Sequence, residues 1–135
     1  MRRRFVHQAR KAGLPLNLSE ASLLWQVKQE PGISQSGVAT LLDLETISVV
    51  RLVDSLQRAC LLERRPHPRD RRIWTLWLTE AGETAAARVR HVNEAVRRDA
   101  LTGVPQAERE QLLDTLQAMR TNLLRASEVD ASLAA

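Results

Sequence analysis

Hydrophobic residues in the first part of the chain recur every three or four positions, which is the spacing of helices that bury one face. The pattern predicts four short helices before residue 60, with Ser19 and Ser34 as N-caps of the second and third. The Glu30-Pro31-Gly32 run is expected to end the second helix. The expected core positions are Phe5, Val6 and Ala9 in residues 2–12, Ala21, Leu23, Leu24 and Val27 in the second helix, Val38, Leu41 and Leu42 in the third, and Val49, Leu52, Val53 and Leu56 in residues 46–59.

A different pattern follows in residues 61–82 and predicts a β-hairpin. The first strand, residues 61–65, breaks at the Pro66-His67-Pro68 turn, because proline lacks an N–H donor and fixes φ. The return strand, residues 73–78, is rich in aromatic and β-branched types and places Trp74, Leu76 and Leu78 on one face. Trp77 alternates to the outer face, and the pattern leaves open whether it packs on a helix or on a neighbouring segment.

Two more helices are predicted after the hairpin. Thr79 is expected to cap the first, which reaches about Asp99. The apolar positions of this helix, Ala85, Val89, Val92 and Val96, form a stripe that we judge too narrow to be buried within one small domain, so we expect a seam against a partner helix. The last helix follows Pro105 and has a second stripe, made of Leu112, Leu113, Leu116, Met119, Leu123 and Leu124. A two-fold dimer is therefore predicted, and an intramolecular helical bundle is the alternative.

The charge is concentrated at the hairpin. Residues 58–72 hold six arginines and two acidic residues, a local +4 that equals the charge of the whole chain. Two short helices joined by a tight turn at Asp43-Leu44-Glu45, followed by a basic hairpin, form a winged helix-turn-helix, so the fold class is mainly α with a small β-hairpin wing (α+β). The cationic tip, Arg69-Asp70-Arg71-Arg72, has the shape and charge to enter the minor groove of DNA.

The helix over residues 46–59 has a polar face with hydroxyl and guanidinium groups, which suits a recognition helix in a major groove. We expect Ser48, Arg51 and Thr46 to read bases, and Arg64, Arg65 and Arg69 to contact phosphates. The residues expected to contact double-stranded DNA are Ser34, Gln35, Ser36, Thr46, Ile47, Ser48, Arg51, Ser55, Arg64, Arg65, Arg69, Arg71 and Arg72.

The totals restrict the class of protein. A chain of 135 residues with 44% hydrophobic and 27% charged residues is expected to form one globular domain. A single cysteine excludes an internal disulfide, and no apolar run approaches a bilayer-spanning length, so a cytoplasmic location is expected. There is no phosphate-binding glycine loop, nucleophile elbow or spaced set of metal ligands, so neither an enzyme nor a cofactor is expected. A winged domain used for protein contacts is the alternative, but it would need neutral or apolar recognition faces, and both faces here are cationic.

The residues from the fourth helix through the hairpin resemble the MarR family, and within it the SlyA branch. The resemblance rests on Ser48-Val49-Val50-Arg51 with Leu52, Asp54 and Leu56, on Leu61-Leu62-Glu63-Arg64-Arg65, and on Asp70-Arg71-Arg72 followed by Leu76, Leu78-Thr79 and Gly82. It covers nearly the whole chain. It implies a homodimeric regulator, most often a repressor, on a pseudo-palindromic operator, with residues 17–79 as the DNA-binding region, residues 1–16 and 80–128 as dimerisation helices, and residues 129–135 as a tail.

The resemblance also implies roles for single residues. Ser48 and Arg51 would meet the major groove, Arg71 or Arg72 would enter the minor groove, and Asp70 would orient a neighbouring arginine. A small aromatic or phenolic ligand would enter a cleft between the dimer helices and the winged domain and release the DNA. Leu16, Leu23 and Trp25 are the candidate ligand-binding residues, although core packing is the favoured interpretation of Trp25.

Three positions depart from the family pattern. The N-terminal helix, residues 2–12, is shorter than usual, and Pro105 replaces a capping hydroxyl residue. Cys60 stands where a glycine commonly ends the recognition helix, so strain is expected at that turn. Cys60 could be a redox-sensitive thiol beside Arg58 and Arg64, or a small buried apolar residue, and the second interpretation is favoured.

Overall fold

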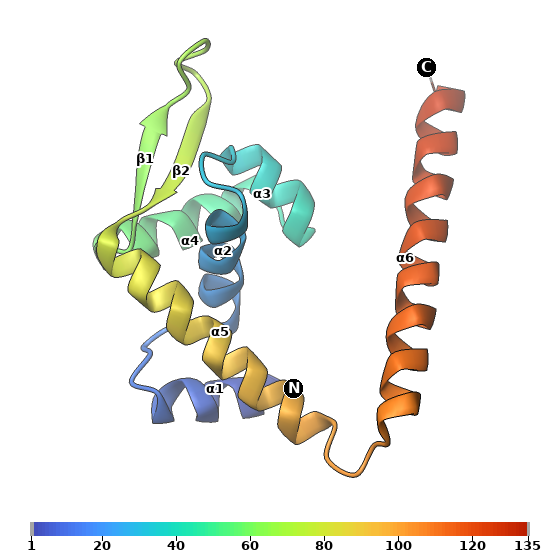
Figure 1. The fold of residues 1–135 in the computed structure, drawn as a ribbon. Helices are drawn as coiled ribbons and strands as arrows, with labels where there is room; N and C mark the ends of the chain where they lie inside the picture. Colours follow the sequence, from blue (N-terminus) through green and yellow to red (C-terminus); the bar gives the residue numbers. More distant parts are fainter. Residues whose placement is uncertain (1, 135) are drawn as a thin grey trace. The chain divides into compact units, whose positions relative to one another are not determined.

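The computed structural model describes residues 2–134, with side chains up to residue 126. The fold is mainly helical with one two-stranded antiparallel hairpin, as predicted (Figure 1). Residues 1–97 and 98–135 form two compact units. The elements are α1 (Arg2–Lys11), α2 (Leu18–Gln29), α3 (Gln35–Leu42), α4 (Thr46–Arg58), β1 (Leu62–Pro66), β2 (Trp74–Leu78), α5 (Glu80–Ala100) and α6 (Gln106–Ala134).

Side-chain caps begin three of these helices. The Ser34 hydroxyl accepts the Gly37 N–H, and the Thr79 hydroxyl accepts the Gly82 N–H, which confirms both predicted caps. The predicted cap at Ser19 is wrong, because α2 begins two residues earlier. Asn17 Oδ1 accepts the Glu20 N–H at 2.9 Å, and the Glu20 carboxylate accepts the Asn17 N–H at 3.0 Å. This reciprocal capping box satisfies two N–H groups at once, which a cap at Ser19 could not do.

The core of the first unit joins α1, α2, α3, α4 and the hairpin. The predicted positions of α2 are all buried, and so are Val49, Val53 and Leu56 of α4, while Val6 and Leu52 are half-buried. The prediction for Leu41 is wrong, since 56% of this residue is exposed. Ala39 is buried in its place, because Val38, Ala39 and Leu42 share the inner face of this short helix.

The expectation that the apolar stripe of α5 needs a partner helix from a second chain is wrong. Ala85, Val89, Val92 and Val96 are buried within the chain itself and belong to the same core cluster as residues of α1 and α2. Small residues explain how a thin stripe is enclosed, because Gly82 and Ala86 let the helix approach its neighbours closely. A Cβ at Gly82 would lie 1.9 Å from the Leu61 carbonyl oxygen, so only glycine fits there.

The apolar stripe of α6 is exposed in the single chain. Between 49% and 67% of each of Leu112, Leu113, Leu116, Met119, Leu123 and Leu124 is exposed. None of the residues 106–126 is buried. Helix α6 extends to Ala134. The tail was expected over residues 129–135, whose side chains are outside the described residues. No helix in the described part of the chain is long and apolar enough to cross a membrane.

Candidate nucleic-acid interface

The two helices α3 and α4 are joined by a tight turn with a left-handed residue. Asp43 caps the end of α3 at φ 51°, and the Leu44 N–H returns to the Ala39 carbonyl at 2.9 Å. Helix α4 then begins at Thr46 with Thr46, Ile47 and Arg51 exposed and Ser48 half-buried. Its buried stripe holds the helix on the core, so the opposite surface is open to a partner.

A segment outside the two-stranded sheet bonds to the hairpin, which the sequence pattern did not indicate. Strands β1 and β2 pair in antiparallel register, with Arg64 opposite Leu76 and Arg65 opposite Thr75. The segment before α3 adds to the other edge of β2: Gly32 N–H donates to the Leu76 carbonyl and Leu76 N–H to the Ile33 carbonyl, both at 2.9 Å. These bonds join the base of the wing to the start of α3.

Trp77 packs on this neighbouring segment, which decides the question left open by the alternation of the strand. Its indole lies against Gly32, where an added Cβ would be 2.8 Å from the ring atom Cζ2. The indole N–H donates to the Thr75 hydroxyl at 3.0 Å. The Arg65 guanidinium lies over the ring, 4.8 Å from its centroid, and also pairs with Glu63.

The hairpin tip carries an acid that orients an arginine, as expected for Asp70. Its carboxylate accepts Nε and Nη2 of Arg72, each at 3.0 Å, and also the Arg72 backbone N–H. The pairing lowers the pKa of Asp70 and raises the pKa of Arg72, because each charge stabilises the other. The Arg72 side chain is nevertheless 90% exposed, so its guanidinium group is oriented by Asp70 and projects into solvent.

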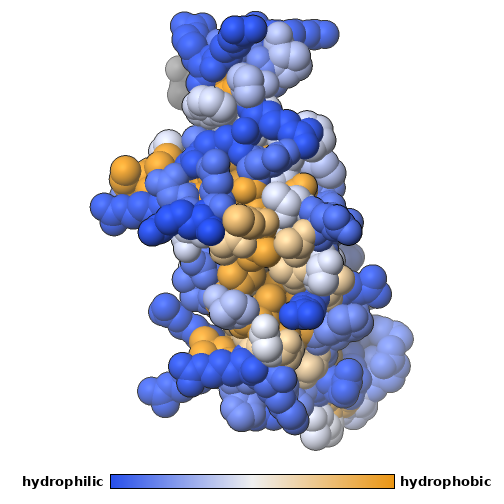
Figure 2. All heavy atoms as spheres, turned by 90° about the vertical axis from the view of Figure 1, so that its left-hand side faces the viewer, coloured by the Kyte–Doolittle hydropathy of each residue, from blue (hydrophilic) through white to orange (hydrophobic). Residues whose placement is uncertain are grey.

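The remaining tip arginines, Arg69 and Arg71, are exposed as well. On the face shown in Figure 2, mostly hydrophilic residues lie at the top, while hydrophobic residues run down the centre of the face below them. The cationic tip is thus separate from the apolar part of this face.

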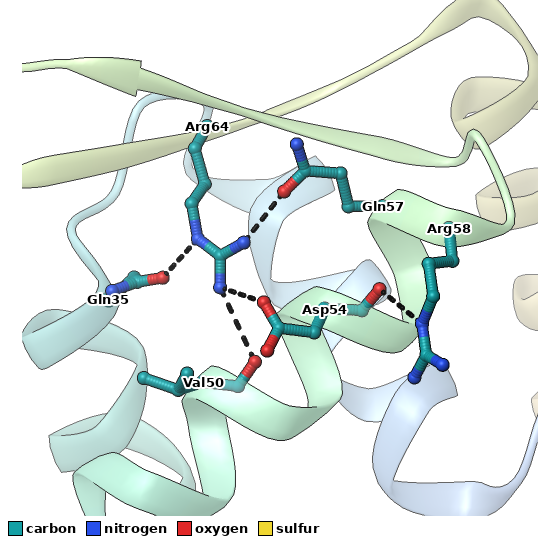
Figure 3. Close-up of polar contacts among 6 residues, drawn as sticks. All are labelled: Gln35, Val50, Asp54, Gln57, Arg58 and Arg64. Carbon is teal, nitrogen blue, oxygen red and sulfur yellow. Dashed lines mark hydrogen bonds and ion pairs between the residues drawn. The ribbon is translucent and has the colours of Figure 1, made fainter.

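Arg64 has a different environment from the other hairpin arginines (Figure 3). Its side chain is only 18% exposed. Its Nε donates to Gln35 Oε1, its Nη1 to Gln57 Oε1 and its Nη2 to Asp54 Oδ1, each at 2.7 Å, and Nη2 also reaches the Val50 carbonyl at 3.4 Å. The guanidinium therefore joins β1 to α3 and α4.

Ser55 and Gln35 are also bonded within the chain. The Ser55 hydroxyl donates to Glu20 Oε1 at 2.6 Å, so it faces α2, and the Gln35 amide oxygen holds Arg64. Ser34 is half-buried and caps α3, whereas Ser36 is exposed. Sequence reasoning missed the bonds of Glu20 to Ser55 and of Gln57 to Arg64, because in each pair the partners lie on different elements.

The candidate ligand residues separate into two groups. Leu16 and Leu23 belong to the buried core. Trp25 is half-buried, packs against that core and also lines an open pocket of about 560 Å³ between α2 and α5. The other lining residues are Gln29, Arg90, Asn93, Glu94 and Arg97. The core packing favoured for Trp25 is thus observed, and its role in ligand binding stays a prediction.

Cys60 ends the recognition helix in the left-handed region, with φ 58°, as the replacement of a glycine led us to expect. The Thr79 hydroxyl donates to its carbonyl oxygen at 2.6 Å, which ties this turn to the start of α5. The expectation that the thiol is buried is wrong, since Cys60 is exposed.

Helices α3 and α4, the turn between them and the antiparallel hairpin define a winged helix-turn-helix protein. Residues 16–74 match the model of the MarR family. The fold is that of a crystal structure of MarR, with a TM-score of 0.82 over 92% of this chain and 83% of that chain at 21% identity. The MarR model covers less than half of this chain, so these two matches show a stretch similar to the MarR family within a MarR-like fold.

Two further similarities concern function. A protein of Thauera aromatica named "Putative transcriptional regulatory protein for hcr operon" is 31% identical over 97 residues, which are 72% of this chain and 58% of that protein. The chain thus spans less than two thirds of this relative's length. The transcriptional repressor CouR, solved bound to a 23-mer DNA duplex, is 28% identical with a TM-score of 0.76, over 88% of this chain and 83% of that chain. Both names are those of regulators, in agreement with the prediction that the chain is not an enzyme.

Proposed function

We propose that this protein is a transcription regulator that binds double-stranded DNA in a sequence-specific way. The observation that carries the proposal is the oriented and exposed fork of Arg72 at the tip of a wing that follows a helix-turn-helix. A guanidinium held in this way suits the narrow, electronegative minor groove. The similarity to CouR, which was solved with a DNA duplex, supports the same partner.

We assign the contacts by exposure and residue type. Ser48, Arg51 and Thr46 of α4 read base edges in a major groove, with Ile47 beside them, and Arg72 or Arg71 enters the adjacent minor groove. Ser34, Gln35, Ser36, Arg65 and Arg69 lie at the edge of this surface and contact the phosphate backbone. Ser55 and Arg64 are bonded inside the chain and support this surface from within.

A homodimer on a pseudo-palindromic operator is the proposed assembly. The exposed leucine stripe of α6 supports it, because an apolar stripe of this length is stabilised by a partner helix. Within the proposed division, residues 17–79 bind DNA, and residues 1–16 and 80–128 form the dimerisation region. The α5 stripe is already covered by its own chain, so α6 supplies most of the apolar seam.

We further propose a repressor that is released by a small aromatic or phenolic ligand, in the SlyA-like branch and in the cytoplasm. The pocket beside Trp25 supports the ligand class, since an indole and the guanidinium groups of Arg90 and Arg97 suit an aromatic acid. The wing residues Asp70-Arg71-Arg72 support the branch. A winged-helix module for protein contacts without specific DNA binding is the alternative function, and the exposed Ile47 of α4 and Leu41 of α3 are the residues that would favour it.

The proposal is tested by selecting duplexes from fragmented genomic DNA and comparing two variants on the selected site. Arg51→Ala is expected to weaken binding to that site by about 1 to 3 kcal/mol and to relax base preference, because it removes a base contact. Arg69→Ala is expected to weaken selected and random duplexes alike, because phosphates carry no sequence information. Equal losses on both duplexes for Arg51→Ala would contradict the assignment of α4, and failure to enrich any duplex would favour the protein-contact alternative.

The assembly is tested separately by the mass of the protein in solution. We expect a dimer at micromolar concentration and a monomer for Leu116→Glu, because a charge would stand in the apolar seam of α6. Glu110→Ala in the same helix is the matched control and should remain dimeric, since it changes charge outside the stripe. A monomeric mass for the unaltered chain would remove the proposed dimer.

A further inference from the structure

The Arg64 network connects three elements that meet at the base of the wing. Its acceptors on α4 are the Val50 carbonyl, Asp54 and Gln57, which lie on one face of that helix at successive turns. The fourth acceptor, Gln35, is the first residue of α3. One guanidinium on β1 thus holds both helices of the helix-turn-helix (Figure 3).

The geometry of this network argues against a direct contact between Arg64 and DNA. Four of its N–H donors are already directed at acceptors in the chain, which leaves little donor capacity for a phosphate. Its side chain is 18% exposed, against 54% for Arg65 and 90% for Arg72. Moving the guanidinium to a phosphate would leave the Asp54 carboxylate and two amide oxygens without it.

The opposite edge of the hairpin is held by a different kind of bond. Gly32 and Ile33 pair with Leu76 through the backbone, and Ser34 forms a bridge with Thr75. Backbone pairing fixes β2 beside the start of α3. The side chain of Arg64 acts on the other strand and is directed at α4, so it adds a side-chain restraint between β1 and the recognition helix.

We propose that Arg64 is a positioning residue that sets the span between the recognition helix and the wing tip, and thereby contributes to sequence specificity without contacting DNA. The inference rests on the proposed function, because the span matters only if α4 and the tip occupy neighbouring grooves. A guanidinium is suited to the role, since its planar fork reaches several acceptors in fixed directions, which a lysine ammonium cannot do.

The first test uses Arg64→Lys, which keeps the positive charge and removes the fork. Positioning predicts that affinity for the selected duplex falls about tenfold, as expected for losing a coupled network, while affinity for random duplex changes by less than about twofold. Arg58→Lys is the matched control, and it should leave both affinities nearly unchanged because Arg58 is exposed and stands outside the proposed DNA contacts. Retained specific affinity in Arg64→Lys would overturn the proposal.

The second test removes the main partner and leaves Arg64 in place. Asp54→Asn abolishes the ion pair, and positioning predicts that the ratio of selected to random affinity falls severalfold. If Arg64 were instead a phosphate contact, freeing it from an acid would strengthen binding to all DNA and steepen the salt dependence by up to about one counterion. A steeper salt dependence of binding together with an unchanged ratio of selected to random affinity would overturn the proposal. Asp54→Asn also replaces the first test if Arg64→Lys does not fold.

The third test needs no DNA and separates this inference from the proposed function. Spin labels at Arg51→Cys and Arg71→Cys, on a Cys60→Gly background that suits the positive φ of that position, report the helix-to-tip distance in the free protein. Arg64→Ala should broaden or shift the distance distribution, whereas Arg58→Ala, which removes an equal charge and an intrahelical bond, should not. An unchanged distribution in Arg64→Ala would refute the positioning role even if the protein binds DNA as proposed, and a broadened one would support it even if no duplex is selected.

Discussion

The base and the tip of the hairpin hold the same residue type in opposite environments. At the base, Arg64 is mostly enclosed and is bonded to α3 and α4, while Thr75 and Leu76 are buried beside it. At the tip, Arg72 is bonded only to its neighbour Asp70 among the described contacts, and it is almost fully exposed. Arg64 therefore links the hairpin base to the helices, whereas Arg72 is an oriented but accessible side chain at the tip.

The difference shows why local charge does not assign a role to an arginine. Every arginine of residues 58–72 adds to the same positive field, which attracts a polyanion at a distance. Only the neighbouring acceptors decide whether a guanidinium is available at contact range. The wing thus exposes one guanidinium, paired with Asp70, at its tip and encloses another, that of Arg64, at its base.

The largest expected effect is on stability and comes from the base. Leu76→Ala should lower the free energy of unfolding by about 2 to 5 kcal/mol, because this side chain is fully buried and its loss leaves a cavity. Ile73→Ala at the tip should change it by less than about 0.5 kcal/mol, since 39% of the residue is exposed. Denaturant unfolding of both variants measures the contrast, and similar losses would show that base and tip do not differ in packing.

A smaller effect is expected at the contact between Gly32 and Trp77. Gly32→Ala should cost about 2 to 3 kcal/mol, because the residue has φ 84° and its new Cβ would push against the indole. Gly13→Ala is the matched control with φ 65° and open space around it, so it should cost only about 1 kcal/mol for the backbone. Thermal unfolding compares the two, and equal costs would show that Trp77 moves aside freely.

The smallest effect concerns the pH dependence of the tip. Arg72 lowers the pKa of Asp70, so the pairing contributes stability above the ordinary aspartate pKa of 3.8 and loses it as the pH falls through the lowered value. The tip should therefore keep its orientation at neutral pH and relax only in acid. Titration of the Asp70 carboxyl by NMR should show its pKa rising towards the ordinary value in Arg72→Ala, and an unchanged pKa would mean that the pair does not persist in solution.

Local patterns in the sequence determined most of the fold. Helical spacing placed α1 to α4, and two of the three predicted serine and threonine caps, Ser34 and Thr79, begin helices as expected. The proline turn and the alternation after it located the hairpin, and the acid beside Arg72 indicated how that arginine would be oriented. These features depend on neighbours within a few positions, which the sequence lists directly.

Tertiary structure alone decided the features that depend on distant partners. The α5 stripe was expected to need a second chain, yet it is buried in the same core cluster as residues of α1 and α2, which a helical pattern does not reveal. Arg64 and Ser55 were expected at a DNA surface, yet each is bonded to residues 10 or more positions away. Side-chain bonds across such separations have no period along the chain, so only the packed fold brings their partners together.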